Sequence, residues 1–490
     1  MTTPATLGQD TTHPHQRELA EVMALVAKEA AAYLDGVDER LVRSPHIAAA
    51  ESRLVGDLPE TGIGAAATMR QLIDEGIDAA IHSTGPRFFH FVMGGVTPAA
   101  LGADWITTAL DQIGYAWVAS PLAVRLEELS LRWLRDLFGL PAEGGGVLTT
   151  GATMANFVSL AAARQWWGEQ HGVDIAERGL AGLPPTPIFS SGYIHPSAVK
   201  AFSMLGLGRD TVRRFERDAV GRLDIDALRA ALVALDGQPA ILVGNAGEVN
   251  GGDFDPIDTL ADLAAEHGAW LHVDGAFGLF ARVSPRTRAL AAGVERADSV
   301  VSDGHKWLNV PYDCGFAFLR EPARLPKVFA YSGAYLAAED DDAQPNFGVR
   351  GPESSRRARS LVVWSTLRAY GREGYRSMVE RHLDLAVRLG LGVDESPVLE
   401  RLADVQLNIV CFRLAPDGWS PEQLNALNER LGKALLEDGR FYVGTTTYDG
   451  RVALRPAFVN WRTRETHVDE FLDVVHAVGA RLVERGPAAT

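Results

Sequence analysis

Lys306 is the residue whose type and position best suit covalent chemistry. It is one of five lysines in a chain of 490 residues. It lies in a turn between two apolar segments, residues 299–302 and 315–319, which are predicted strands. An amine in such a turn is partly desolvated, so it can lose its proton and form a Schiff base with a carbonyl group. A lone lysine in a core turn is more often structural, and the functional interpretation therefore depends on its companions.

Asp274 and His195 also follow predicted strands. Asp274 ends the apolar segment 270–273, where an unpaired acid is costly. A carboxylate there can keep a pyridine nitrogen protonated, so that the ring withdraws electrons from a bound amino acid. His195 follows the short segment 187–190, and its flat imidazole can stack on such a ring. A helix-capping aspartate and a structural histidine are the alternatives, but with Lys306 the set predicts a site for pyridoxal 5′-phosphate (PLP).

The phosphate of such a cofactor needs backbone N–H groups at the start of a helix. The stretch Thr149–Asn156 joins a predicted strand at 146–150 to a predicted helix at 154–164. Ala152 and Thr153 would supply N–H groups there, and Thr153 would add a hydroxyl. Many α/β helices begin with a similar turn, so this signal counts only together with Lys306.

Short apolar segments alternate with helical ones through the middle of the chain. We predict strands at 146–150, 187–190, 240–244, 270–273, 299–302 and 315–319. This alternation predicts an α/β fold with a mostly parallel sheet covered on both faces, in which ligands bind beyond the carboxyl ends of the strands. We divide the chain into an N-terminal helical segment (1–85), a large domain (86–377) and a smaller C-terminal α/β domain (378–490).

The composition excludes several classes of function. The net charge of −16 and the pI of about 5.3 argue against a nucleic-acid or anionic-membrane partner. The two cysteines, Cys314 and Cys411, build neither a disulfide framework nor a Cys-rich metal site. The first 17 residues lack the apolar core of a signal peptide, and no apolar run approaches the ~20 residues of a membrane span. We therefore expect a cytoplasmic protein without a metal site.

Four stretches resemble the group II PLP-dependent amino-acid decarboxylases, which include aromatic-L-amino-acid, glutamate, histidine and diaminobutyrate decarboxylases. Residues 302–315 (SDGHKWLNVPYDCG) resemble the lysine motif of that family. Residues 86–91, 112–127 and 355–361 resemble its substrate-access, dimer-contact and post-loop stretches, in the same order. The resemblance covers about residues 60–480. It implies fold type I (aspartate-aminotransferase-like) with a seven-stranded, mostly parallel sheet, and an obligate homodimer with its sites at the interface.

The resemblance also implies a role for each matching residue. Lys306 would carry the Schiff base, Asp274 would pair with the pyridinium nitrogen, and His195 would stack on the ring and help to place the substrate carboxylate. The remaining cofactor contacts would be Ala152, Thr153, Ala276, Asp303 and His305. The substrate pocket would include Phe88, Phe91, Val92 and Met93, with Tyr115 and Trp117 reaching the neighbouring subunit's pocket.

The chain departs from the family pattern at two places. Asn250 lies in a turn that is usually rich in threonine, and we expect it to replace a hydroxyl near the phosphate or the ring oxygen. In the mobile loop the family usually has a tyrosine that protonates the substrate carbon after CO₂ leaves. Counting back from residues 356–357 puts Phe347 at that position, and a different gap puts Arg350 there. Tyr331 and Tyr335 lie upstream and would serve only in a different loop arrangement.

These features predict decarboxylation of an L-amino acid to an amine. The aromatic and apolar stretch at residues 88–93 favours an aromatic or large apolar substrate. Phenylalanine cannot donate a proton, and in some relatives loss of the loop tyrosine accompanies oxidative deamination to an aldehyde, with ammonia, CO₂ and peroxide. An aminotransferase with Arg455 on the substrate carboxylate, a carbon–carbon lyase and a non-catalytic scaffold are further alternatives. A scaffold would be expected to have lost Lys306 or Asp274.

Overall fold

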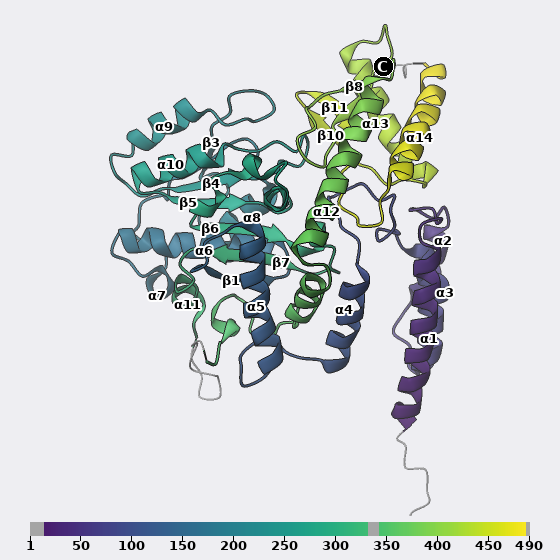
Figure 1. Ribbon diagram of the computed structural model, residues 1–490, viewed down its shortest axis with the longest axis horizontal. Coiled ribbons are helices and arrows are strands. Elements are labelled where there is room, and N and C mark those ends of the chain that lie inside the picture. Colours follow the sequence, from purple (N-terminus) through teal and green to yellow (C-terminus); the bar gives the residue numbers. More distant parts are fainter. Residues whose placement is uncertain (1–13, 332–342, 487–490) are drawn as a thin grey trace, which may run out of the picture.

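A sheet of seven short strands forms the centre of the molecule, and the computed structural model describes residues 14–331 and 343–486 (Figure 1). The strands lie in the order β1-β7-β6-β5-β4-β2-β3, and only β7 runs antiparallel to its neighbours. Every residue of β4 to β7 is buried, as expected for a sheet covered on both faces. The bounds are β1 (Gly145–Thr149), β2 (Ile188–Ser190), β3 (Val212–Arg214), β4 (Ile241–Asn245), β5 (Trp270–Asp274), β6 (Ser299–Asp303) and β7 (Gly315–Leu319).

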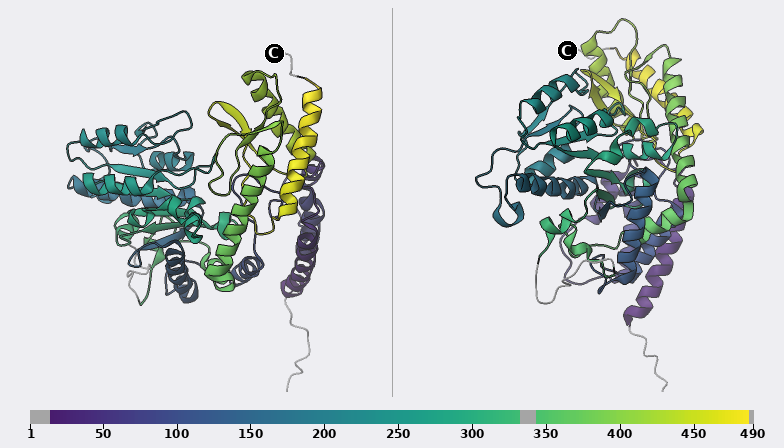
Figure 2. Two further views of the ribbon diagram at one scale, coloured as in Figure 1. Left: turned by 45° about the horizontal axis from the view of Figure 1, so that its top comes forward. Right: turned by 60° about the vertical axis from the view of Figure 1, so that its left-hand side comes forward.

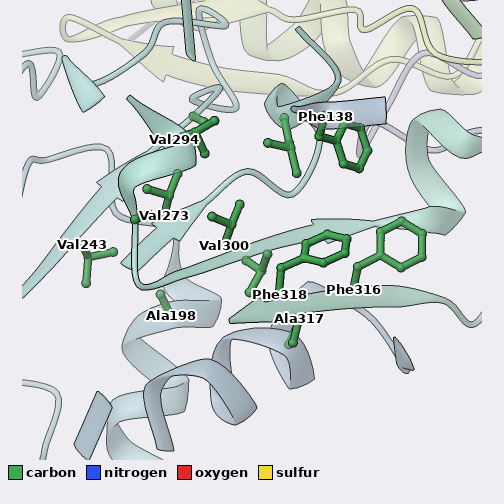
Figure 3. Close-up of a cluster of buried hydrophobic side chains, with 14 of the residues drawn as sticks. Phe138, Ala198, Val243, Val273, Val294, Val300, Phe316, Ala317 and Phe318 are labelled. Atoms are coloured by element: carbon green, nitrogen blue, oxygen red, sulfur yellow. The ribbon is translucent and has the colours of Figure 1, made fainter. Parts of the chain in front are cut away.

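Helices pack against both faces of this sheet. Figure 3 shows buried side chains on the two sides of the strands, with Phe138 and Val294 on one side and Ala198 and Ala317 on the other. Among the helices, α6 contacts β5, β6 and β7, α10 contacts β4 and β5, and α5 contacts β1. The helices of this part are α4 (Pro98–Leu110), α5 (Pro121–Phe138), α6 (Ala152–Gln170), α7 (Ile175–Arg178), α8 (Pro196–Met204), α9 (Ile225–Val233), α10 (Ile257–His267) and α11 (Arg324–Phe329).

The two ends of the chain form smaller units. At the N-terminal end, α1 (Pro14–Gly36), α2 (Ile47–Leu54) and α3 (Ala65–Ala79) pack on one another, and α1 and α3 run side by side away from the large sheet (Figures 1 and 2). The C-terminal part has an antiparallel sheet in the order β10-β11-β9-β8. Its elements are β8 (Leu399–Arg401), β9 (Phe412–Leu414), α13 (Pro421–Asp438), β10 (Thr445–Tyr448), β11 (Arg451–Leu454) and α14 (Glu465–Glu484).

A long kinked helix, α12 (Ser360–Asp394), connects the large and C-terminal parts. The kink lies at Gly371, whose φ of 59° is in the left-handed region that favours glycine. The predicted domain boundary at residue 378 falls inside this helix and stays a prediction. The predicted α/β class with a seven-stranded, mostly parallel sheet is confirmed. None of the helices in the described parts is long and apolar enough to cross a membrane.

A buried ion pair connects two of the stretches that resemble family motifs to β1. The side chains of Glu127 and Arg356 are each 2% exposed and form a hydrogen-bonded pair. Arg356 also donates hydrogen bonds to the carbonyl oxygens of Gly114 and Leu148, and Glu127 accepts one from the Leu148 N–H at 2.9 Å. Removing one partner of such a buried pair costs about 3–5 kcal/mol because the other charge is left unpaired. The pair therefore holds the region before α5 against β1 and the start of α12.

His382 gives the fold a specific sensitivity to acid. Its ring is fully buried, Nδ1 accepts a hydrogen bond from Trp307 Nε1 at 2.8 Å, and Nε2 donates to the Asn460 carbonyl at 2.9 Å. Burial lowers the pKa of His382 to about 3, with a smaller contribution from Arg381. An unfolded histidine takes up its proton near pH 6.5, whereas the folded one does not until about pH 3.

We therefore expect His382 to destabilise the fold progressively below pH 6.5. Between pH 6.5 and 3 the unfolded state binds one proton more than the folded state at this site, so its contribution falls by ~1.4 kcal/mol per pH unit. The His382→Asn variant should be less stable at pH 7 but lose less stability on acidification. Thermal unfolding midpoints of both proteins across this range measure the difference. Parallel curves would contradict the expectation.

Candidate active site

A cavity of about 340 Å³ opens at the carboxyl ends of the parallel strands. Its walls come from the residues that follow β1, β2, β4, β5 and β6, which is where an α/β sheet binds ligands. Eight residues predicted from the sequence line it: Lys306, Asp274, His195, Ala152, Thr153, Ala276, Asp303 and His305. A larger cavity of about 1020 Å³ lies between α5, β1 and α11, and none of these eight residues lines it. The chemistry-bearing residues thus converge on the smaller cavity.

Lys306 lies in the helical turn 304–308 that directly follows β6. Its side chain is 18% exposed, and its Nζ is 3.1 Å from Oδ2 of Asp303. The ring of Phe277 lies on another side, with its centroid 5.9 Å from Nζ. The amine is therefore held at the cavity wall by a buried carboxylate and an aromatic face, and it remains accessible to a ligand in the cavity.

Asp274 is the last residue of β5 and is almost fully buried. Its Oδ2 accepts a hydrogen bond from Asn156 Nδ2 at 2.9 Å, and its Oδ1 accepts one from the backbone N–H of Ala276 at 3.1 Å. Both contacts are donors, and they hold the two carboxylate oxygens in a fixed orientation. Such a group can balance a protonated ring nitrogen in the cavity.

His195 precedes α8 and acts as its N-cap. Its Nδ1 accepts from the backbone N–H of Ser197 at 3.2 Å and lies 2.6 Å from the Ser197 hydroxyl. Burial lowers the pKa of His195, and the nearby Asp274 opposes this shift. The imidazole is therefore neutral at pH 7, with its proton on Nε2, which suits stacking on a pyridinium ring better than a second positive charge would.

At the start of α6, where the sequence predicts that backbone N–H groups bind the phosphate, one N–H group has a partner within the protein. Ala152 and Thr153 begin α6, but the Ala152 N–H donates to Oδ1 of Asp303. His305 borders the same region, where its ring stacks on Tyr312 with centroids 4.2 Å apart. A Cβ added to Gly151 would lie 2.9 Å from the His305 ring, so this approach requires glycine.

The residues around the cavity fit PLP. A helix N-terminus at one end suits a phosphate. The Asp274 carboxylate suits the pyridine nitrogen, the neutral His195 suits the ring face, and the Lys306 amine suits the aldehyde carbon. Among the described residues, no group of three His, Cys, Asp or Glu side chains could hold a metal ion.

Asn250 does not line this cavity, contrary to the expectation for its turn. Its Oδ1 instead accepts a hydrogen bond from the Thr446 hydroxyl. Glu248 causes this orientation, because its carboxylate accepts the backbone N–H groups of Asn250 at 2.8 Å and Gly251 at 2.7 Å and so closes the turn. Glu248 itself lines the cavity, and burial raises its pKa. The sequence could have indicated Glu248 as a site residue, because it is an acid in the turn that follows a buried strand.

The predicted substrate segment contacts the lysine turn but does not line the Lys306 cavity of its own chain. Phe88 and Val92 are buried, and Phe88 stacks on Tyr442 at 4.9 Å. Phe91 is 57% exposed, and its φ of 55° and that of Val92 (56°) lie in the left-handed region. Strain of this kind concentrates at functional sites. Met93 follows them, and the next N–H, that of Gly94, donates to the His305 carbonyl at 3.3 Å.

Phe347 and Arg350 lie outside the Lys306 cavity and line the larger one. Phe347 is fully buried, with the Arg350 guanidinium 4.6 Å and that of Arg356 5.4 Å from its ring centroid. Burial of the apolar ring beneath two cations explains why this side chain points into the protein. Tyr115 accepts the Phe347 N–H through its carbonyl at 2.8 Å.

The other predicted loop and interface residues also lie away from Lys306. The ring of Trp117 lies 4.9 Å from the Arg125 guanidinium, and Trp117 does not line the Lys306 cavity. The Tyr331 hydroxyl is 2.6 Å from the Ser354 hydroxyl and donates to that of Tyr115 at 3.4 Å. Tyr335 lies outside the described residues. Sequence reasoning also missed Tyr193 and Tyr312, which line the cavity.

Known proteins resemble this chain along most of its length. Residues 66–415 match the pyridoxal-dependent decarboxylase conserved domain. The L-2,4-diaminobutyrate decarboxylase of Rhizobium meliloti (strain 1021) is 31% identical over 85% of this chain and 83% of its own. The aromatic-L-amino-acid decarboxylase of Bacillus atrophaeus is 28% identical over 88% of both chains. The phenylacetaldehyde synthase of Arabidopsis thaliana is 27% identical over 87% of this chain and 89% of its own.

A solved structure agrees with the fold and the cofactor. The Oryza sativa tryptophan decarboxylase in complex with PLP and tryptamine superposes with a TM-score of 0.88 at 25% identity, over 97% of this chain and all of the other. The predicted fold type I is thereby confirmed. The family match covers well over half of the chain and agrees with the residues around Lys306. The chain belongs to the pyridoxal-dependent decarboxylase family and is a PLP-dependent carboxy-lyase.

Proposed function

We propose that this chain decarboxylates an L-amino acid with an aromatic or large apolar side chain and releases the corresponding amine and CO₂. The observation that carries this proposal is the convergence of Lys306, Asp274 and His195 on one cavity at the carboxyl ends of the sheet. The roles of these residues rest on their geometry and on the chemistry of the donor set.

Each of the three residues has a definite task. When bound, PLP supplies an aromatic ring that accepts the electrons left behind as CO₂ departs. Lys306 would hold the cofactor through its amine. Asp274 would accept a hydrogen bond from the ring nitrogen and would keep the positive charge there. His195, neutral and fixed by Ser197, covers the ring face and helps to orient the substrate carboxylate.

The substrate class is supported by the segment at residues 88–93. Its Phe91 is an exposed aromatic ring, its Phe88 and Val92 are buried apolar side chains, and the Gly94 N–H that follows the segment donates to the His305 carbonyl in the lysine turn. Relatives that act on aromatic amino acids point the same way. Because one relative is a diaminobutyrate decarboxylase, an amino acid with a basic side chain is the alternative substrate to compare with the aromatic ones.

Oxidative decarboxylation to an aldehyde is the second candidate, and Phe347 favours it. This side chain is fully buried and carries no proton donor, and it stands at the position where the family usually has a tyrosine when the residues are counted without a gap. The alternative gap places Arg350 there, which is not a tyrosine either. Tyr331 is hydrogen-bonded to Ser354 and Tyr115. An aldehyde synthase is among the relatives.

A panel of L-amino acids tests substrate and outcome together. We expect CO₂ and amine in equal amounts from phenylalanine, tyrosine or tryptophan, with little turnover of glutamate or 2,4-diaminobutyrate. Measuring CO₂, amine, aldehyde, ammonia and peroxide in the same reactions distinguishes the two outcomes. Aldehyde with stoichiometric peroxide would replace the first proposal by the second, and turnover of glutamate alone would contradict the substrate class.

We further propose that the chain works as a homodimer in the cytoplasm, with the sites at the interface. Large apolar side chains are exposed on the N-terminal helices and near α4, as expected for surface that a second copy covers: Leu19, Met23, Ile106, Leu110, Val118 and Leu122. Tyr115 and Trp117 lie close to this surface in sequence. Cys314 and Cys411 are buried free thiols, which suits a reducing compartment.

A further inference from the structure

A chain of buried hydrogen bonds leads from Trp270 to Asp274. Trp270 Nε1 donates to the Ser299 hydroxyl oxygen at 3.0 Å, and that hydroxyl lies 2.9 Å from His272 Nδ1. His272 Nε2 lies 2.7 Å from Asn156 Oδ1, and Asn156 Nδ2 donates to Asp274 Oδ2 at 2.9 Å. All five side chains are buried, with exposures between 0% and 6%.

The strand geometry explains how these residues meet. Trp270, His272 and Asp274 alternate along β5 and therefore share one face of the sheet. Ser299 pairs directly with His272 on the neighbouring strand β6, and Asn156 comes from α6, which packs on both strands. Polar side chains on a buried strand face are costly unless each finds a partner.

The Trp270 end fixes the direction of the first hydrogen bond and is compatible with a hydroxyl that donates onward to His272. An indole N–H donates and cannot accept. Ser299 therefore accepts from Trp270, and its own hydroxyl hydrogen is free to point to His272 Nδ1. His272 then carries its proton on Nε2, which donates to Asn156. Burial lowers the pKa of His272 to about 4, so the ring is neutral and has a single proton to place.

The Asp274 end requires the same direction independently. A carboxylate accepts and cannot donate. The Asn156 amide must therefore turn its NH₂ group toward Asp274 and its oxygen toward His272, which obliges His272 to donate from Nε2. The acceptor-only carboxylate thus fixes the orientation of the Asn156 amide and places the His272 proton on Nε2. With Nδ1 of His272 then an acceptor, the Ser299 hydroxyl accepts from Trp270 and donates to His272.

We propose that Trp270, Ser299, His272 and Asn156 form a one-way hydrogen-bond chain that positions Asp274 for the cofactor and presents it as a charged acceptor. This inference rests on the role proposed above for Asp274. Aligned hydrogen bonds polarise one another, so a donor several residues away strengthens the last bond to the carboxylate. None of Trp270, Ser299, His272 and Asn156 lines the cavity, and they are positioning residues rather than catalytic ones.

Breaking the chain far from Asp274 tests the inference. In Ser299→Ala, both the cavity wall and Asn156 are untouched, but His272 Nδ1 loses the hydroxyl that donates to it, so the polarising series of hydrogen bonds is cut before His272. We expect the holoenzyme to release PLP about three- to tenfold faster, because the bond to a charged group is weakened. We also expect its visible absorbance to change at a different pH from that of the wild type.

Two companion variants separate positioning from packing. Ser299→Thr keeps the hydroxyl and should restore the wild-type release rate. Ser360→Ala is the matched control, since Ser360 is equally buried and donates one hydrogen bond to the Ala123 carbonyl at 2.7 Å, away from this chain. It should lower thermal stability without changing PLP release. If Ser299→Ala does not fold, Ser299→Val against Ser299→Thr gives the same comparison with equal shapes.

The results distinguish two ways in which the inference can be wrong: the hydrogen-bond chain does not affect Asp274, or Asp274 itself does not hold the cofactor. One outcome would overturn the proposed hydrogen-bond chain alone. In it, Ser299→Ala (or Ser299→Val) releases PLP at the wild-type rate while Asp274→Asn releases it faster. Wild-type release in both would overturn the role of Asp274 as well. Equal acceleration by Ser360→Ala would show a general loss of packing and would also overturn the inference.

Discussion

Replacing Lys306 with alanine is expected to lower the rate of CO₂ release by about 10²–10⁴-fold. In the proposed function the amine at this position would hold the cofactor. Without it, PLP remains only through non-covalent contacts, and the visible absorbance band of the holoenzyme should be lost. Rates of CO₂ release and absorbance spectra of the purified variant measure the two effects.

Lys327→Ala is the matched control for this experiment. Lys327 lies on α11 with its side chain 54% exposed, and its Nζ is 3.0 Å from the Glu169 carboxylate. Surface ion pairs of this kind contribute little to stability. The variant should keep both activity and absorbance. A Lys306→Ala enzyme that retained the visible band would assign the cofactor to another amine.

Asp274→Asn is expected to reduce CO₂ release by about 10²–10³-fold, the effect of removing one preorganised electrostatic partner. The amide has nearly the same shape as the carboxylate, but its single oxygen can accept only one of the two hydrogen bonds that Asn156 and Ala276 donate to separate oxygens of Asp274. The charge opposite the ring nitrogen also disappears, so the ring withdraws electrons less strongly. Single-turnover measurement of CO₂ release with saturating PLP isolates this effect from weaker cofactor binding.

An aspartate-to-asparagine substitution at Asp298, at the opposite end of the strands, is the control for Asp274→Asn. Asp298 lies just before β6, where its Oδ2 accepts the Leu271 N–H at 2.8 Å, and it is not among the residues lining the cavity. Asp298→Asn should change thermal stability but leave CO₂ release unaltered. Equal losses of activity in the two variants would mean that the carboxylate of Asp274 has no special role.

The central strands could be read from the sequence because their burial is complete. The predicted segments 240–244, 270–273, 299–302 and 315–319 agree with β4 to β7 within one residue. Strand β3 was missed because it is three residues long, lies at the sheet edge and has exposed arginines in place of apolar residues. The apolar pattern that predicts buried strands is absent there.

The site residues that could be predicted are those that directly follow a buried strand. Lys306, Asp274 and His195 have this property, and the sheet brings them to one cavity. Asn250 lies outside the cavity because its orientation is decided by the carboxylate of Glu248, a contact within the turn that no periodicity reveals, and its predicted role stays a prediction. The inward position of Phe347 depends on Arg350 and Arg356, a contact that only the folded chain creates.

Identifying the amine that holds the cofactor tests the central claim most directly. Borohydride reduction of the holoenzyme, followed by digestion and mass spectrometry, fixes the cofactor on the residue that carries it. We predict a pyridoxyl group on the peptide that contains Lys306 and on no peptide containing Lys28, Lys200, Lys327 or Lys433. A pyridoxyl group on one of those four lysines, or none on any lysine of a PLP-loaded enzyme, would contradict the account.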